Sequence, residues 1–431
     1  MKIDSLYTAF LKTTSVSTDS RTVEKGALFF ALKGPRFNGN QFAEEALEKG
    51  AKYIVVEQSS GLKKNDRIVF VKNPLITLQQ LAKYHRKKMK LPIIAITGSN
   101  GKTTTKELIR EVLSKKYSVL ATKGNFNNHI GVPLTLLQLK KHHEIGIIEM
   151  GANHLQEIQT LCEIAQPDWG YITNFGKAHL EGFGSEEGVI KGKSELYQYL
   201  IKNQGKIVVN GNDSKQVKLT KGHKPIVFGN QENYCFYIST QDTKSNRLIL
   251  KFKEHLFSSP LHGIYNLNNL AASITFGALF DVPLSHIQEA IKAYKSTNNR
   301  SQKINIKGIQ FILDAYNANP SSMESALDSF SRIDPKKSAV VLGDMLELGD
   351  YSKQAHEKIL ENSLKLQFQS IYTLGGDFKK TEVIGSNIKK FDSMETLYQS
   401  FKKDFSSWKH ILIKGSRSMK MEKLIEFFQA D

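Results

Sequence analysis

The residues with the clearest chemistry occupy positions 97 to 104, which read TGSNGKTT. They follow an apolar run at 93–96 and precede a helical pattern, so this loop would join a buried strand to a helix. In that setting, backbone N–H groups and the helix dipole can bind phosphate, and glycines let the backbone approach the anion. Lys102 would reach the terminal phosphates and Thr103 would place its hydroxyl on Mg²⁺. We therefore predict an ATP-binding loop formed by Gly98, Ser99, Asn100, Gly101, Lys102, Thr103 and Thr104.

This loop matches only the shorter G-x-x-G-K-T form of the phosphate-binding pattern, because the additional earlier glycine is absent. The alternative is a glycine-rich turn that merely caps a helix. The strand before the loop and the Lys-Thr-Thr run after it favour the phosphate-binding interpretation.

Two further residues follow apolar runs that read as strands. Glu149 comes after 145–148, at a strand's carboxyl end, where open α/β sheets place ligand-binding groups, and one carboxylate there suits Mg²⁺. His179 comes shortly after the run 170–173, although a lone histidine is more often a capping or core group than a ligand. Lys191 and Lys193, in IKGKSE, read by spacing alone as exposed helix lysines.

Taken together, these motifs resemble those of the Mur ligase family in order and spacing. The resemblance rests on the loop at 97–104, Asn127-Asn128 with Gly131 and Pro133, Glu149-Met150-Gly151, His179 and KGKSE. It extends from Asp19-Ser20-Arg21 to Lys414-Gly415-Ser416-Arg417. The strings DAYNANPSSM at 314–323 and GDMLELG at 343–349 are similar to those of the members that join D-alanyl-D-alanine to UDP-N-acetylmuramoyl-tripeptide.

The resemblance implies an ATP-dependent ligase that forms an acyl phosphate, uses two Mg²⁺ ions, and acts on those two substrates in peptidoglycan synthesis. It assigns catalytic roles to Lys102, His179 and Lys193, with Lys193 carbamylated by CO₂ to help hold the second metal ion. It implies metal ligands at Thr103, Glu149, His179 and Lys193, and further nucleotide contacts at Asn266, Asn269, Arg300 and Asp314. It implies substrate contacts at Ser20, Arg21, Asn38, Asn127, Asn128, Asn317, Asn319, Asp344 and Glu347.

Some positions depart from the family's pattern. Asn38 and Asn40 stand where many members have Asp and His, so a plain Asn-Gly turn is an equal alternative to a uridine contact there. Tyr265 replaces a common His. Asp344, Glu347 and His356 could position the incoming amine or accept its proton, and structural hydrogen bonding is equally open for each.

The elements that must position these residues read as an α/β protein of three domains. We expect a small α/β domain at 1–88, a doubly wound ATP-binding domain at 89–298 and a Rossmann-like domain at 299–431. The resemblance implies that the first domain holds the UDP end of the sugar nucleotide and that the third carries the amine substrate. The expected strands are 27–32, 53–56, 93–96, 145–148, 170–173, 207–209, 311–313, 339–342, 371–374 and 411–413. The segment 294–299, rich in Ser, Thr and Asn, is the best linker candidate.

Composition and charge limit the localisation, the roles of the cysteines and the partners that we expect. The 431 residues contain no apolar run long enough for a membrane helix and no secretory signal, so we expect a cytoplasmic protein without membrane insertion, and a monomer. The two cysteines, Cys162 and Cys235, lack metal or disulfide spacing and read as core residues. The charge of +18 favours anionic partners, but the densest basic run, 86–90, lacks interleaved aromatics, and we expect a solvated helix face without nucleic-acid binding.

Alternative functions share parts of this pattern. Other Mur-type amino acid ligases and folylpolyglutamate synthetase have the same loop, but DAYNANP argues against both. A nucleotide-dependent binding module is the alternative outside the enzymes, and it has no need of the series Glu149, His179 and Lys193.

Overall fold

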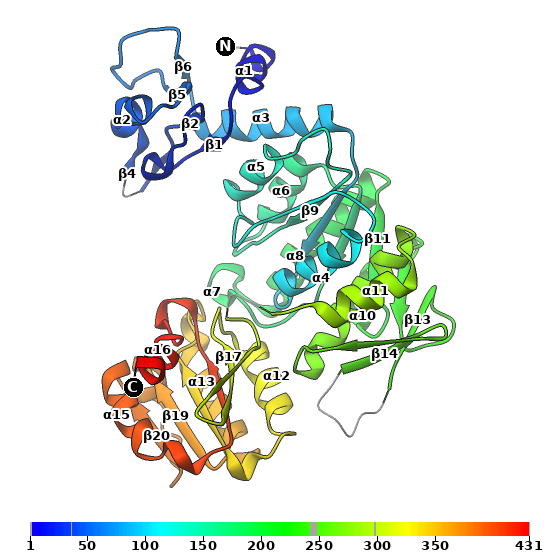
Figure 1. The fold of residues 1–431 in the computed structure, drawn as a ribbon, viewed down its shortest axis with the longest axis vertical. Coiled ribbons are helices and arrows are strands. Elements are labelled where there is room, and N and C mark those ends of the chain that lie inside the picture. Colours follow the sequence, from blue (N-terminus) through cyan, green and yellow to red (C-terminus); the bar gives the residue numbers. More distant parts are fainter. Residues whose placement is uncertain (1, 36, 242–247, 297–298, 431) are drawn as a thin grey trace.

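The computed structural model describes residues 2–35, 37–241, 248–296 and 299–430. Three α/β domains follow one another along the chain, each built on its own sheet (Figure 1). The amino-terminal and third domains both extend from the same side of the central domain, so the molecule has an open C shape (Figure 1). The predicted three-domain α/β fold is confirmed.

The amino-terminal domain is a parallel sheet of four strands in the order β1-β2-β5-β6. Side chains alternate along β2, so Leu28 and Phe30 face the helices α1 and α3 while Phe29 faces α2. Its elements are α1 (Ile3–Phe10), β1 (Val16–Ser17), β2 (Leu28–Phe30), α2 (Ala43–Glu48), β5 (Tyr53–Glu57), β6 (Ile68–Val71) and α3 (Pro74–Met89). A two-stranded ribbon, β3 (Lys33–Gly34) with β4 (Phe37–Asn38), leads into the Asn-Gly turn.

Helix α3 connects the first two domains and corrects one prediction. Asn73 caps its first turn, with Pro74 at the first helical position. Arg86 is buried rather than solvated, and its guanidinium donates to Ala165 O and pairs with Asp168 Oδ2 at 2.7 Å. The neighbouring lysines of the run are exposed. Arg86 therefore makes structural contacts at the domain junction, whereas the lysines of the same run face solvent.

The central sheet has nine strands in the order β15-β14-β13-β12-β11-β10-β7-β9-β8. All neighbours from β8 to β13 are parallel, and β14 and β15 add antiparallel strands at one edge. The strands are β7 (Ile93–Thr97), β8 (Val119–Ala121), β9 (Ile145–Glu149), β10 (Trp169–Ile172), β11 (Lys206–Asn210), β12 (Ile226–Gly229), β13 (Phe236–Thr240), β14 (Leu248–Phe252) and β15 (His255–Ser259). After β9 the chain crosses to the other side of β7, so the loops following β7, β9 and β10 meet at one edge.

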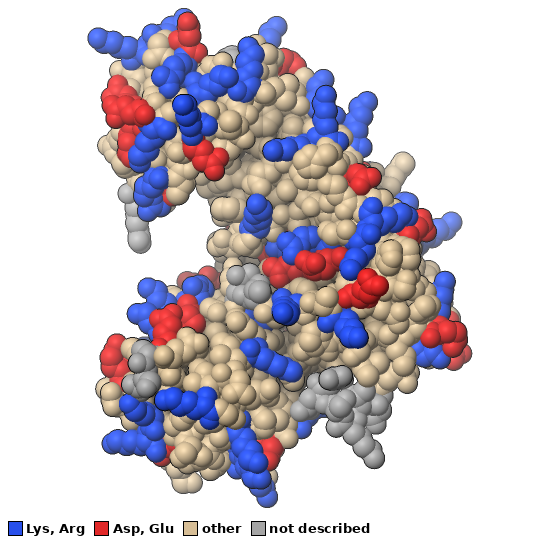
Figure 2. Space-filling model, in the orientation of Figure 1, with Lys and Arg blue, Asp and Glu red and all other residues tan. Residues whose placement is uncertain are grey.

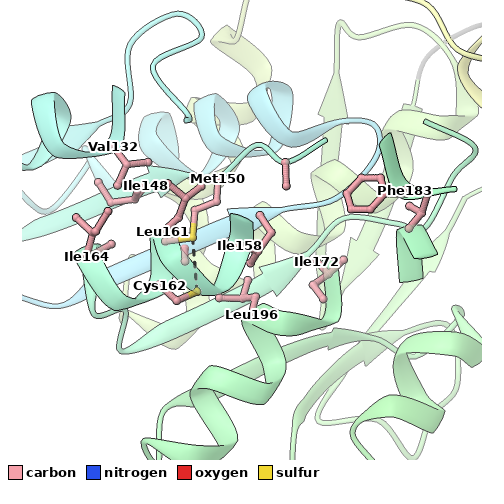
Figure 3. Packing of buried hydrophobic residues seen from close by; sticks show 14 of the residues in the cluster. Val132, Ile148, Met150, Ile158, Leu161, Cys162, Ile164, Ile172, Phe183 and Leu196 are labelled. Carbon is pink, nitrogen blue, oxygen red and sulfur yellow. Dashed lines mark hydrogen bonds between the residues drawn. The ribbon is translucent and has the colours of Figure 1, made fainter. Parts of the chain in front are cut away.

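Helices cover both faces of this sheet. One face packs against α4, α10 and α11, and the other against α3, α5, α6 and α8. These helices are α4 (Lys102–Leu113), α5 (Gly131–Leu136), α6 (Glu157–Ala165), α8 (Glu186–Lys202), α10 (Leu267–Leu279) and α11 (Leu284–Ala293), with short α7 (Leu180–Phe183) and α9 (Ser214–Leu219). Between the sheet and the helices α3, α5, α6 and α8, the sulfur atoms of Cys162 and Met150 lie 3.8 Å apart among buried aliphatic side chains (Figure 3). Met150 directly follows Glu149, so this core fixes the end of β9.

The third domain has six strands in the order β16-β17-β21-β18-β19-β20, all parallel except β16. Its strands are β16 (Gln302–Ile306), β17 (Ile309–Asp314), β18 (Ser338–Gly343), β19 (Ser370–Leu374), β20 (Ile388–Phe391) and β21 (His410–Lys414). Its helices are α12 (Pro320–Phe330), α13 (Ser352–Lys365), α14 (Gly376–Lys379), α15 (Met394–Lys403) and α16 (Lys423–Ala430). The proposed linker 294–299 includes residues 297 and 298, outside the described residues, and the domain limits at 88 and 298 stay predictions.

Three bulk expectations can be compared with the structure. Within the described part of the chain, no helix combines the length and apolarity needed to cross a membrane. Cys162 is buried as expected, but Cys235 is exposed, so the core prediction was wrong for that residue. On the face seen in Figure 2, Lys and Arg are scattered over all three domains among Asp and Glu, without a single basic stripe.

Candidate active site

A cavity of about 1210 Å³ opens where the carboxyl edge of the central sheet meets the third domain. Its wall brings together most of the residues predicted from sequence. These are Ser99, Asn100, Gly101, Lys102, Thr103, Thr104, Asn127, Asn128, Glu149, His179, Asn266, Asn269, Arg300, Asp314, Asn317, Asn319 and Glu347.

The loop between β7 and α4 has the geometry of an anion site. Gly98 has φ +139°, and a Cβ there would lie 2.1 Å from Thr173 Oγ1. Gly101 has φ +79°, and a Cβ would lie 2.7 Å from Asn269 Oδ1. Thr105 N donates to Gly101 O at 2.8 Å, so the N–H groups of residues 102–104 come before the helical hydrogen-bond ladder. These three residues line the cavity. Both glycines are therefore required by close approach as well as by backbone conformation.

Lys102 is folded back onto this loop. Its ammonium donates to Gly98 O at 2.7 Å and Ser99 O at 3.2 Å. Burial lowers the pKa of Lys102, with Glu149 opposing and Arg300 reinforcing that shift. A phosphate offered at the helix terminus would supply a stronger acceptor than these two carbonyl oxygens.

Glu149 ends β9 and is almost fully buried. Its backbone N–H donates to Thr122 Oγ1 at 3.0 Å, and its Oε1 accepts from Asn127 Nδ2 at 2.8 Å. Its other oxygen, Oε2, is buried, accepts no hydrogen bond from the described residues and lies 3.6 Å from Lys106 Nζ. This oxygen therefore faces a cation without being hydrogen-bonded to it.

Lys193 is fully buried in α8. Its spacing alone had predicted an exposed lysine, and that prediction is wrong. Its ammonium donates to Ala152 O at 2.7 Å and lies 4.9 Å from the ring centroid of Phe183. Burial, and then the charge of Lys102, hold the pKa of Lys193 well below its usual range. An amine in that environment is neutral more readily than a surface lysine, and a neutral amine is the nucleophilic form.

His179 lies between the central and third domains. It occupies the left-handed region, with φ +55°, directly before α7. Its Nδ1 is hydrogen-bonded to the Glu347 carboxylate, and this contact lowers the pKa of Glu347. Glu347 also has a positive φ, +61°, and its carbonyl accepts from Glu181 N at 3.3 Å.

The nucleotide contacts implied by the resemblance form a second group on the cavity wall. Asn269 donates to Asn266 Oδ1 at 2.8 Å and accepts from Thr105 Oγ1 at 3.0 Å, which ties α10 to the loop helix. Arg300 stacks on Tyr316 at 3.6 Å from the ring centroid, and its buried Nε has no hydrogen-bond partner among the residues that the structure describes.

Asp314 and residues near it form a set of hydrogen bonds where the edge of the third domain lines the cavity. The Asp314 carboxylate accepts from Lys414 Nζ at 2.6 Å and from Ser301 N at 3.0 Å. Tyr265, which stands in the place of a common His, is hydrogen-bonded to Ser301 Oγ at 2.8 Å. Lys414 also donates to the carbonyl of Asn317 at 3.4 Å, so it holds the start of the DAYNANP segment.

Several predicted residues lie elsewhere. Asp344 does not line the cavity. Its carboxylate accepts hydrogen bonds from Asp377 N at 3.0 Å and from Phe378 N at 2.9 Å, and it thereby caps the first turn of α14. His356 is buried and accepts from Met345 N at 3.0 Å. The roles proposed for these two residues at the incoming amine do not agree with this placement, and structural hydrogen bonding accounts for both.

The predicted uridine contacts are in the amino-terminal domain, outside the cavity. Arg21 is exposed and paired with Asp19, while Ser20 is buried. Asn38 accepts from the backbone and side-chain amides of Asn40, at 3.1 and 2.8 Å. The Asn-Gly turn is therefore held by its own side chains.

Sequence reasoning missed three residues of the site. Lys106 pairs with Glu149, Lys414 pairs with Asp314, and the Asn174 carboxamide accepts from Asn100 N at 3.0 Å. Lys106 carries a signal that could have been used, because it lies one turn after Lys102 on the same face of α4. Asn174 follows strand β10, and Lys414 is the last residue of β21.

Comparison with known proteins agrees with this geometry. The family model described as Mur ligase middle domain matches residues 96–277, the Mur ligase, glutamate ligase domain matches 299–417, and the Mur ligase family, catalytic domain matches 12–91. The UDP-N-acetylmuramoyl-tripeptide--D-alanyl-D-alanine ligase of Bacillus subtilis is 34% identical over 422 residues, which cover 95% of this chain and 92% of that protein. The chain belongs to the Mur ligase family.

Other Mur ligases extend the comparison. The Escherichia coli protein of the same name is 31% identical over 426 residues, covering 96% of this chain and 93% of its own length. The crystal structure of MurF from Acinetobacter baumannii superposes with a TM-score of 0.88 at 29% identity, covering 100% of this chain and 99% of that one. MurF from Thermotoga maritima in complex with ADP gives a TM-score of 0.84 at 29% identity, with 98% of each chain covered.

Proposed function

We propose that this Mur ligase joins D-alanyl-D-alanine to UDP-N-acetylmuramoyl-tripeptide, with ATP converting the tripeptide carboxylate to an acyl phosphate. The observation that carries the proposal is the position of Glu149 and Lys102 in one cavity whose opposite wall belongs to the third domain. The relatives named for this reaction match nearly the whole chain, including the third domain, where Mur-type ligases differ. Another Mur-type amino acid ligase, or folylpolyglutamate synthetase, is the alternative that the same loop would allow.

The cavity supplies what two reacting anions need. A carboxylate and the γ-phosphate of ATP repel each other, and positive charge in a partly dry cleft offsets this repulsion. Lys102 and the first-turn N–H groups of α4 would hold the phosphates while the tripeptide carboxylate attacks phosphorus and ADP leaves. The amine of D-alanyl-D-alanine then attacks the carbonyl carbon, the amine loses a proton, and inorganic phosphate leaves.

The residues present also fit Mg²⁺. The described residues include no group of three or more His, Cys, Asp or Glu arranged to hold a metal, so a site made by protein carboxylates alone is not formed there. Mg²⁺ usually takes one or two protein carboxylates plus substrate phosphates, and Glu149, which lines the same cavity as Thr103, suits that arrangement. When bound, the ion would neutralise charge on the phosphoryl oxygens.

A second metal site involves Lys193 and His179 in our proposal. Carbamylation would turn the buried Lys193 amine into an oxygen ligand, and its lowered pKa favours the neutral amine that reacts with CO₂. His179 would have to release Glu347 to become a ligand, which a movement of the third domain could bring about. The amino-terminal domain would hold the uridine nucleotide, with Ser20, Arg21 and Asn38 as proposed contacts.

A phosphate-release assay with UDP-N-acetylmuramoyl-tripeptide, ATP and a panel of amines tests this function. We expect release with D-alanyl-D-alanine and only background release with L-alanine, D-glutamate, diaminopimelate or lysine. Lys102→Ala should abolish the signal, whereas Lys115→Ala, at an exposed lysine beyond the end of the same helix, should retain it. Release with a different amine would identify another ligase of the family, and full turnover by the Lys102 variant would remove the proposed phosphate site.

A further inference from the structure

Lys106 is a buried cation next to the carboxylate at the end of β9. It lies one helical turn after Lys102 on α4, so both side chains are on the same face. Lys106 and Glu149 are each 2% exposed, and Lys106 Nζ lies 3.6 Å from Glu149 Oε2. The two lysines thus serve different groups, since Lys102 contacts the phosphate loop while Lys106 faces the carboxylate.

The two oxygens of Glu149 have unequal surroundings. Oε1 accepts a hydrogen bond from Asn127, whereas Oε2 is buried and has none. A carboxylate oxygen removed from water costs free energy unless a donor or an opposite charge is near. The Lys106 ammonium provides that opposite charge.

We propose that Lys106 is a positioning residue that holds Glu149 ready for a divalent cation and makes cation binding depend on the nucleotide. This inference rests on the proposed function, which places Mg²⁺ at Glu149. A divalent ion held by Oε2 would share this oxygen with the Lys106 ammonium, which lies 3.6 Å from it. The two cations repel each other until the phosphates of a nucleotide add negative charge beside both.

A purely structural role for Lys106 makes a different prediction. If the ion pair only stabilised the fold, its removal would lower the melting temperature without increasing affinity for a divalent cation. Under the proposal, removing the charge also removes the repulsion, so the nucleotide-free protein binds the cation more tightly. Cation affinity therefore separates the two roles, and it does not depend on turnover.

Mn²⁺ binding to the full chain, followed by the EPR signal of the free ion with and without ADP, provides the test. We expect weak binding by the unsubstituted protein alone and tighter binding with ADP. Lys106→Met should bind Mn²⁺ at least about tenfold more tightly without ADP, because a nearby like charge is lost. Lys106→Arg, which keeps the charge, should follow the unsubstituted protein. Arg86→Met removes a buried cation paired with the Asp168 carboxylate, away from the cavity, and should leave nucleotide-free Mn²⁺ affinity unchanged.

The results distinguish this inference from the function on which it rests. Equal or weaker Mn²⁺ binding by Lys106→Met without ADP, beside normal ADP-dependent binding by the unsubstituted protein, would overturn the role of Lys106 alone. Absence of Mn²⁺ binding by the unsubstituted protein even with ADP would overturn the metal site at Glu149 and this inference together. If Lys106→Met does not fold, Lys106→Gln goes through the same titration and must show the same tightening.

Discussion

The side-chain amides of Asn100 and Asn319 are hydrogen-bonded to each other across the junction between the phosphate loop and the third domain. Asn319 Nδ2 donates to Asn100 Oδ1 at 2.8 Å, and Asn100 Nδ2 to Asn319 Oδ1 at 3.4 Å. Asn319 is also the N-cap of α12, where it accepts from Ser322 N at 2.9 Å. One side chain therefore caps the start of a helix of the third domain and contacts the nucleotide loop of the central domain.

We expect Asn100→Ala and Asn319→Ser each to weaken ADP binding about three- to tenfold, the usual contribution of one hydrogen bond. Serine keeps the helix cap, so Asn319→Ser should melt near the unsubstituted protein, whereas Asn319→Ala should lose about 1 kcal/mol. Calorimetric titration with ADP measures the affinities. Because both single changes break the same pair, the double variant should bind about as well as either one. Fully additive losses would show that the pair does not couple the domains.

Gly101→Ala should weaken ADP binding by at least about tenfold. Its left-handed φ is unfavourable for alanine, and the new Cβ would lie 2.7 Å from Asn269 Oδ1, displacing the loop from α10. Gly308→Ala is the matched control, because Gly308 has φ +83° with no atom within 4 Å of a Cβ. Both variants carry the backbone cost, but only the first should lose affinity in an ADP titration. Similar affinity in the two variants would argue against the close approach.

Lys193→Ala should lose most of its activity, and a short carboxylic acid such as acetate should restore part of it. Truncation of Lys193 leaves space beside the middle of α8, in which a free carboxylate can take the place of the proposed carbamate. Phosphate release with and without added acid measures the rescue, and chloride at equal ionic strength controls for salt. An alanine variant with full activity and no additive would contradict the carbamate role.

The buried His262 ring should make the free energy of unfolding depend on pH. Burial lowers the pKa of His262 to about 4, and its buried Nε2 has no hydrogen-bond partner in the described part of the chain. The unfolded chain, in which the pKa is about 6.5, therefore binds more protons between these values. The contribution of the neutral ring to stability is complete above about pH 6.5 and is lost as the pH falls toward about 4.

Melting temperatures measured from about pH 7 down to about pH 4.5 should fall less steeply in His262→Gln than in the unsubstituted protein. His286→Gln is the control, since His286 is exposed on α11 and its ring meets solvent in both states. Equal slopes for all three proteins would mean that His262 does not contribute to acid sensitivity.

The sequence by itself determined the local elements and their chemistry. The runs 93–96 and 145–148 form β7 and β9 because continuous apolar segments are stable only when buried on both faces of a sheet. Glycines 98 and 101 mark the phosphate loop, since only glycine tolerates that conformation and proximity. Motif order then predicted the family and the three α/β domains, both of which are confirmed.

Tertiary structure decided which partner each polar residue has. Lys193 and Arg86 read as exposed helix positions, yet both are buried, because helix periodicity gives a face but does not say what packs on it. Asp344 follows a strand like Glu149, but it caps α14 instead of facing the cavity. The pairs Lys106–Glu149 and Asn100–Asn319 join residues 43 and 219 positions apart. Contacts over such separations depend on how strands and domains are placed, which local sequence patterns do not encode.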